Sequence, residues 1–179
     1  MKKNVVRVLS LLLLLTVALT AASCANTDDT PDGMQNVAIE NAAFDLFVPE
    51  SWIAQNSAGV SGARVSNTDT SNVTATVYMP DVEMTVEAYW NDFCMPAYQN
   101  GVLKDFSVLT EQCADTTLGG KNAKQYVFVY TMDGTAYEVM QVIAVHGSYV
   151  YTLTYTAESV HYANHLETVE SIRANFRFR

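Results

Sequence analysis

Positive charge is scarce in this sequence. Its 179 residues include 10 lysines and arginines against 19 aspartates and glutamates, which gives a formal net charge of −9. Nucleic acids and anionic lipid headgroups attract basic surfaces, so they are poor partners for a chain this acidic. We therefore expect no nucleic-acid partner, and we interpret the acidic residues mainly as a solvated surface.

Catalytic and cofactor motifs are also missing. The sequence contains no Gly-x-Ser-x-Gly segment, and the turn at residues 119–121 lacks the spacing of a phosphate-binding loop. We therefore predict no catalytic residue and no cofactor, and we expect a binding protein rather than an enzyme. An enzyme, for example a hydrolase, remains the alternative, because a site assembled from distant residues need not leave a linear motif.

The chain begins with the pattern of a secretory signal peptide. Lys2, Lys3 and Arg7 form a basic end, residues 8–19 are almost wholly apolar, and small residues precede Cys24. The apolar run is shorter than the roughly 20 residues that span a bilayer, which favours a cleaved signal over a permanent anchor. We predict that residues 1–23 are removed, which leaves a mature chain with a formal net charge of −12.

Residues 20–24, Thr-Ala-Ala-Ser-Cys, resemble the lipobox of bacterial lipoproteins, with Ala where Leu is commonest. The resemblance implies that Cys24 carries a diacylglyceryl group with fatty acids such as palmitate. The alternative is an ordinary signal peptide followed by a chance cysteine. We expect an extracytoplasmic protein that lipid on Cys24 anchors to the cell membrane, or to the outer membrane in a Gram-negative bacterium.

The mature chain divides into a short tether and one domain. Residues 24–36 are polar, rich in turn formers and without apolar periodicity, which predicts a flexible tether with a reach of about 20 Å. Residues 37–179 are numerous enough for one domain with a sizeable core. Cys94 and Cys113 could form a disulfide outside the cytoplasm, or they could be two buried thiols, and the sequence leaves both open.

Two periodicities alternate along the domain. Apolar residues at helical spacing predict helices over residues 85–98, with Thr85 as N-cap and Pro96 as a kink or early end, and over residues 158–174. Period-two patterns predict the strands, and Asp133-Gly134 predicts a tight hairpin turn. The expected strands cover residues 44–48, 73–79, 106–109, 112–118, 123–131, 136–145 and 149–156.

The central strands are apolar on both faces, so each face of the sheet needs a cover. Two helices are available, and successive hairpins make neighbouring strands antiparallel. The predicted fold class is α+β, an α/β/α sandwich around a mainly antiparallel sheet.

The segment Phe44-Asp45-Leu46-Phe47-Val48-Pro49-Glu50-Ser51-Trp52 resembles the opening hairpin of PsbP-like domains. The later order of strands, helix, four long strands and a C-terminal helix ending at Asn175-Phe176 is similar as well. The resemblance implies a PsbP-like fold over residues 37–179. Members of that family mostly bind or stabilise other proteins, and they share no catalytic motif that maps onto this sequence.

One cluster of metal-ligand residues stands out. Glu158, His161 and His165 would share one face of the second helix, and two histidines four residues apart can bind a transition metal. The helix lacks the Glu after the first His that a zinc protease needs. We therefore predict no metal site here and retain a weak metal-binding lipoprotein as an alternative.

Tyrosine is abundant, with ten in the chain, many of them on consecutive predicted strands. Tyrosine suits half-buried surfaces because its ring packs while its hydroxyl stays in water. The simple interpretation is a sheet face under a helix; the functional one is a groove for an envelope protein or a small ligand. The residues of that candidate surface are Tyr126, Tyr130, Tyr137 and Tyr151.

Overall fold

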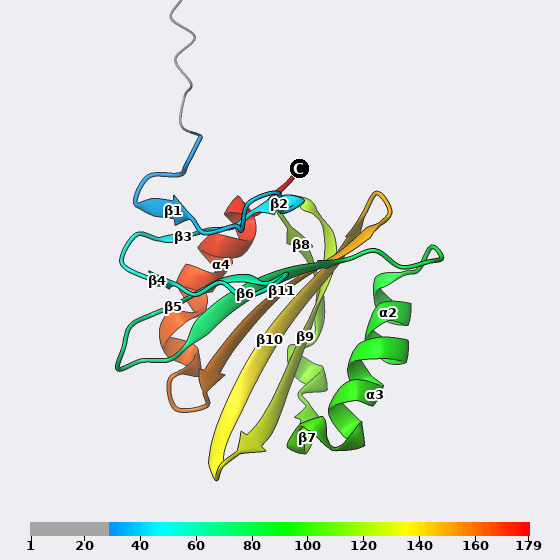
Figure 1. Ribbon diagram of the computed structural model, residues 1–179. Coiled ribbons are helices and arrows are strands. Elements are labelled where there is room, and N and C mark those ends of the chain that lie inside the picture. Colours follow the sequence, from blue (N-terminus) through cyan, green and yellow to red (C-terminus); the bar gives the residue numbers. More distant parts are fainter. Residues whose placement is uncertain (1–28) are drawn as a thin grey trace, which may run out of the picture.

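An antiparallel sheet forms the centre of the protein (Figure 1). The computed structural model describes residues 29–179. The strands of this sheet are β4 (Ile53–Ala54), β5 (Ser61–Arg64), β6 (Asn72–Tyr78), β7 (Lys104–Val108), β8 (Ala114–Leu118), β9 (Lys121–Met132), β10 (Thr135–His146) and β11 (Tyr149–Glu158). Their order is β4-β5-β6-β11-β10-β9-β7, β8 also pairs with β9, and all these pairings are antiparallel.

Tight turns connect the long central strands. Asp133 and Gly134, both with positive φ, form the β9–β10 turn, as the sequence predicts. The register places Tyr130 opposite Tyr137 and Val139 opposite Phe128. The predicted mainly antiparallel sheet is therefore confirmed.

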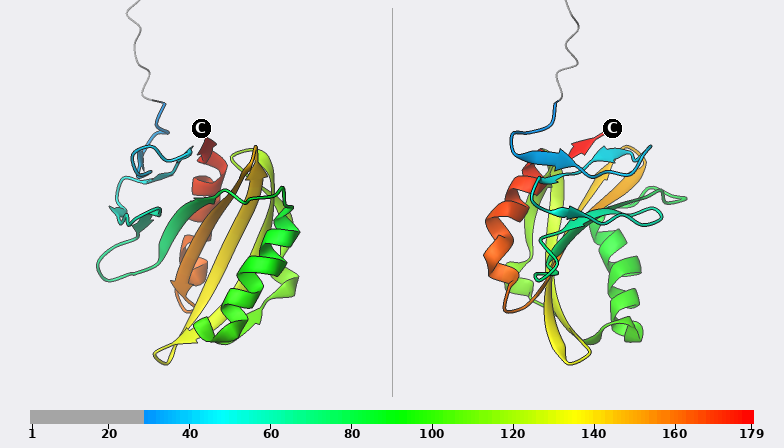
Figure 2. Two further views of the ribbon diagram at one scale, coloured as in Figure 1. Left: turned by 45° about the vertical axis from the view of Figure 1, so that its right-hand side comes forward. Right: turned by 60° about the vertical axis from the view of Figure 1, so that its left-hand side comes forward.

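A helical segment covers one face of the sheet, here called the α2 face (Figure 2). It runs through α2 (Val86–Tyr89), η1 (Trp90–Cys94), α3 (Met95–Ala97) and η2 (Tyr98–Val102), where η1 and η2 are wider π-type turns. The Thr85 side chain accepts a hydrogen bond from the Ala88 amide at 3.1 Å, so the predicted N-cap is confirmed. Pro96 does not end the helix, which continues through α3 into η2, and the wider turn η1 directly precedes it.

The opposite face, the α4 face, packs against α4 (Leu166–Asn175), which follows the short turn η4 (Tyr162–His165). The predicted start of this helix at residue 158 is wrong. Glu158 still belongs to β11, where it pairs with Tyr137, and the Ser159 amide donates to the Ala136 carbonyl. Pairing with β10 thus keeps the chain extended past the expected boundary.

Short strands close one end of the domain. β1 (Met34–Asn36) pairs with β3 (Phe47–Pro49), and the C-terminal β12 (Arg177–Phe178) pairs with β2 (Phe44–Asp45). β1 lies inside the range expected to be a flexible tether, so the ordered structure begins earlier than residue 37. This polar segment has no apolar pattern, and its hydrogen bonds to β3 hold it in place instead.

Two clusters of buried side chains flank the sheet. The larger lies under α4 and includes Leu46, Val73, Leu153 and Ile172, all close to fully buried. The smaller lies under the α2 segment around Trp90, Phe128 and Ile143. Both faces of β9 and β10 are thus covered by apolar contacts, as their sequences predict.

Candidate functional site

The α2 segment leaves part of its sheet face uncovered. It packs over β9 and β10, whereas the neighbouring β6 and β11 present a threonine stripe, defined as Thr74, Thr76, Thr152, Thr154 and Thr156. All of these except Thr152 are partly exposed. Gln141 joins the helix to this stripe, because its amide donates to the Tyr98 hydroxyl at 3.1 Å and to the Thr154 hydroxyl at 3.3 Å.

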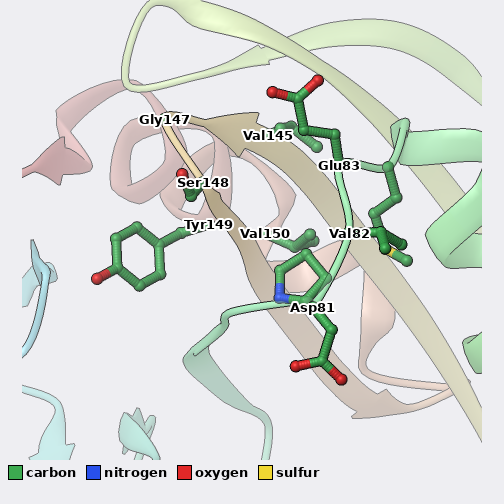
Figure 3. Close-up of a pocket in the computed structure, with 10 residues that line it drawn as sticks. Asp81, Val82, Glu83, Val145, Gly147, Ser148, Tyr149 and Val150 are labelled. Atoms are coloured by element: carbon green, nitrogen blue, oxygen red, sulfur yellow. The ribbon is translucent and has the colours of Figure 1, made fainter.

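A hollow of about 410 Å³ lies at one end of the stripe, here called the apex pocket. Its walls are the β6–α2 linker and the β10–β11 hairpin, two segments that are far apart in the sequence (Figure 3). Val145 and Val150 face the linker, whereas the Tyr149 ring points away from it. The lining residues are Pro80, Asp81, Val82, Glu83, Met84, Val145, Gly147, Ser148, Tyr149 and Val150.

Large apolar side chains are exposed around this pocket. Val82 is 69 % exposed and Met79 is 63 % exposed, so most of the apolar surface of each side chain is in contact with water. Clustered exposed apolar residues of this kind mark interaction surfaces. The apex surface comprises Tyr78, Met79, Val82, Phe93 and Val145.

Three aromatic rings give the apex surface a rigid part. Tyr78, Tyr89 and Phe93 lie with their ring centroids 5.8–6.0 Å apart. Burial raises the pKa of Tyr89, and its hydroxyl is hydrogen-bonded to Thr152, so this tyrosine is neutral and fixed. Fixed aromatic side chains lose little entropy on binding, which is why interfaces are enriched in them.

The rim of the apex pocket is negatively charged. Asp81 and Glu83 line the pocket, and Asp92 lines an adjoining hollow that shares Glu83 with it. All three carboxylates are exposed, and none lies within ion-pair distance of a cation among residues 29–179. The nearby Glu87 differs, because Lys124 binds it at 2.8 Å. The apex therefore combines an apolar centre with exposed carboxylates.

The structure separates the four tyrosines expected to form one groove. Tyr126 stacks on Trp90 with centroids 4.1 Å apart, and Tyr130 stacks on Tyr137 at 5.3 Å, all on the α2 face. Tyr151 is 1 % exposed in the core under α4. The expected four-tyrosine groove is wrong, because the Tyr151 side chain points to the opposite face of the sheet.

The three candidate metal ligands do not share one helix face as expected, because they belong to different elements. Glu158 ends β11, His161 lies in the following turn, and His165 ends η4. His165 instead hydrogen-bonds Asp69 at 2.8 Å. Within residues 29–179, no group of three potential metal ligands is found.

The Asp69–His165 pair is the arrangement closest to a catalytic dyad. Its two members are distant in sequence, as the hydrolase alternative requires. The adjacent Ser71 is 2 % exposed, and its backbone amide donates to Asp69. This serine is not accessible to a substrate, so the geometry favours a structural pair that holds the β5–β6 loop against η4.

Cys94 and Cys113 are free thiols, so the disulfide considered from the sequence is not formed. Cys94 is buried on the apolar side of the helix, and burial raises the pKa of its thiol to about 11. A thiol with so high a pKa is a poor nucleophile. The lipidation candidate Cys24 lies outside the described residues.

A second hollow, here called the distal pocket, lies at the other end of the sheet. It has a volume of about 280 Å³ and opens beside the β9–β10 hairpin. Its lining combines polar, aromatic and aliphatic side chains and contains no carboxylate. The residues are Gln55, Arg64, Thr70, Asn72, Tyr130, Met132, Tyr137, Thr156 and Ala157.

Comparisons with known proteins support the architecture but reveal no close relative. Neither the family models nor the curated proteins give a match. Among solved structures, the cyanobacterial PsbP protein CyanoP of Synechocystis superposes with a TM-score of 0.61 at 10 % identity, over 89 % of this chain and 99 % of CyanoP. The fold is PsbP-like.

Two further neighbours show how widely this fold is used. LpqN of Mycobacterium tuberculosis, described as involved in cell envelope biogenesis, superposes with a TM-score of 0.56 at 18 % identity, over 80 % of this chain and 90 % of LpqN. The Ran-binding protein Mog1p of Saccharomyces cerevisiae gives 0.56 at 8 % identity, over 81 % and 95 % of the two chains. At these identities the PsbP-like domain shares a fold with its neighbours, and function must be argued from its own surface.

Proposed function

We propose that this protein is a lipid-anchored, non-enzymatic domain of the bacterial cell envelope that binds another envelope protein through its apex surface. The observation that carries the proposal is the set of exposed apolar side chains around the apex pocket. Burial of such residues at an interface removes apolar area from water and stabilises a complex. The PsbP-like fold of LpqN, an envelope-biogenesis protein, supports the cellular setting.

The position of the apex relative to the tether supports the same proposal. The described chain begins at residue 29, at the end of the domain that also holds β1, β12 and the β10–β11 hairpin (Figures 1 and 2). His146 of this hairpin contacts Phe178 of β12 with ring centroids 4.8 Å apart. A lipid on Cys24 would therefore hold the apex close to the membrane, within reach of membrane proteins. None of the helices of the described chain is long and apolar enough to cross a bilayer.

Site-specific photocrosslinking in cells tests the proposal. A photoreactive phenylalanine at Val82, in the apex surface, should capture a discrete protein partner. The matched control is Val160, which is 78 % exposed and lies outside the apex surface. Equal capture from both positions, or none from position 82, would show that the apex is not the binding surface.

A further inference from the structure

The distal pocket is separate from the apex surface. It lies beside the β9–β10 hairpin, whose tip points away from the end at which residue 29 lies (Figure 1). The side chains that form it come from β5, β6, β9, β10 and β11, together with two connecting segments. A site built mostly on paired strands is held in a fixed geometry.

Arg64 provides the charge in this pocket. Its register partner on β6 is Asn72, which in turn pairs with Thr156 of β11, so the three side chains lie in one row across the sheet. One terminal nitrogen of Arg64 donates to the Asn67 side-chain oxygen at 2.7 Å. Its Nε is buried without a hydrogen-bond partner in the described chain. The guanidinium thus retains unused donor capacity, and a buried donor without an acceptor is unfavourable.

Arg64 differs from the other arginines of residues 29–179 because it has no carboxylate partner. Arg173, Arg177 and Arg179 each bind a carboxylate within ion-pair distance. Arg64 has no such partner among the described residues, and no Asp or Glu lines the pocket around it. Asp69 lies in the β5–β6 loop that directly follows Arg64, but its carboxylate is hydrogen-bonded to His165. The distal pocket is therefore a locally cationic site within an anionic surface.

The remaining lining residues suit a small planar or polar ligand. Gln55 and Asn72 carry amides, and Thr70 and Thr156 carry hydroxyls. The stacked rings of Tyr130 and Tyr137 form an aromatic wall. Guanidinium groups bind carboxylates through paired hydrogen bonds, and hydroxyl and amide donors add to such binding.

We propose that the distal pocket binds a carboxylate-bearing ligand through Arg64, with the Tyr130–Tyr137 pair against its apolar part. The carboxylate belongs either to a small organic acid or to the C-terminus of a peptide. A volume of about 280 Å³ fits a ligand of this size but not a larger folded partner.

The two sources are distinguished by binding measurements on the full mature lipoprotein in detergent micelles. Benzoate represents the aromatic acid and N-acetyl-dialanine the peptide C-terminus, and each is compared with its uncharged amide. NMR titration should show that at least one acid binds ten-fold or more tightly than its amide, with the largest shifts near Arg64 and Tyr137. If neither acid binds, or if acid and amide bind alike, the proposal is wrong.

Variants then test the role of Arg64. Arg64→Met should weaken binding of the acid at least ten-fold, whereas Lys104→Met, which removes an exposed cation outside the pocket, should leave it unchanged. Arg64→Lys keeps the charge and loses the planar donor pair, so it should also bind the acid more weakly. If Arg64→Met does not fold, Arg64→Lys decides: unchanged affinity overturns the proposal, and a clear loss supports it. Because the apex is not involved, failure of this test leaves the proposed partner-binding function standing.

Discussion

At the scale of single residues, Asp69 shows how a loop is fixed. Its carboxylate accepts hydrogen bonds from the Ser71 amide at 2.9 Å and from His165 at 2.8 Å, a residue far away in the sequence. Burial alone would raise the pKa of Asp69, but the hydrogen bonds from Ser71 and His165 outweigh it and lower the pKa to about 2. The folded protein therefore favours the ionised carboxylate.

This lowered pKa predicts an acid-sensitive contribution to stability. The contribution is fully present above the ordinary aspartate pKa of 3.8 and is lost as the pH falls towards 2, because the unfolded chain then binds a proton more readily. Chemical unfolding between pH 5 and pH 2 should show a smaller pH dependence for Asp69→Asn than for the wild type. Asp81→Asn, at an exposed carboxylate without an ion pair in the described chain, serves as control. If the free energy of unfolding of Asp69→Asn depends on pH as steeply as that of the wild type, Asp69 is not the source of the acid sensitivity.

At the scale of elements, the β8–β9 turn packs against the end of α4. The Gly119 amide donates to the Arg173 carbonyl at 3.0 Å, and a Cβ atom at Gly119 would lie 2.1 Å from the Phe176 carbonyl oxygen. Gly119 also has a φ of +53°, which is unfavourable for residues with a side chain. Glycine at this position thus lets a hairpin and a helix end approach each other closely.

Gly119→Ala should therefore destabilise the fold severely, by more than about 3 kcal/mol, since the clash involves backbone that cannot move freely. Gly120→Ala is the matched control, because that glycine also has positive φ (+76°), yet a Cβ atom added there would have no neighbour within 4 Å. Gly120→Ala should lower the free energy of unfolding by only roughly 1–2 kcal/mol, which is the cost of placing a side chain on a backbone with positive φ. Urea unfolding measures both, and equal losses would refute the packing argument.

The long hairpins were predictable from the sequence because their signals are local. Alternation along β9, β10 and β11 and the Asp133-Gly134 turn do not depend on distant residues. The shorter elements were harder. β1 lacks an apolar pattern and exists because β3 supplies its hydrogen bonds. The start of α4 was misplaced because Glu158 is held in the sheet by its pairing with Tyr137.

At the scale of the whole molecule, the proposed lipid anchor determines which surfaces can meet a partner. Cys24→Ser should abolish fatty-acid labelling and either release the protein from the membrane or leave its signal peptide uncut. Radiolabelled palmitate incorporation and membrane fractionation measure this. Cys94→Ser is the matched control and should retain labelling, because that thiol is buried in the domain. Labelling that survives Cys24→Ser would disprove the anchor and remove the membrane from the proposed function.

The candidate sites show the limit of sequence reasoning at this scale. The tyrosine count indicated a binding surface, but the expected groove included Tyr151, which is buried, and missed the apex altogether. Met79 and Val82, apolar residues in a short linker that begins near Pro80, were the available signal for the apex. Arg64 gave no signal, because its isolation from carboxylates depends on residues distributed over the whole sheet.

Local sequence patterns were sufficient for the fold class, the paired hairpins and the apolar character of both sheet faces, because periodicity and turn chemistry act over a few residues. Which side chains remain exposed depends instead on how the elements pack in three dimensions. Strand order and helix placement bring the linker after β6 to the β10–β11 hairpin, and they place Arg64 in the same pocket as the Tyr130–Tyr137 pair. These arrangements join residues tens of positions apart, so no local pattern encodes them.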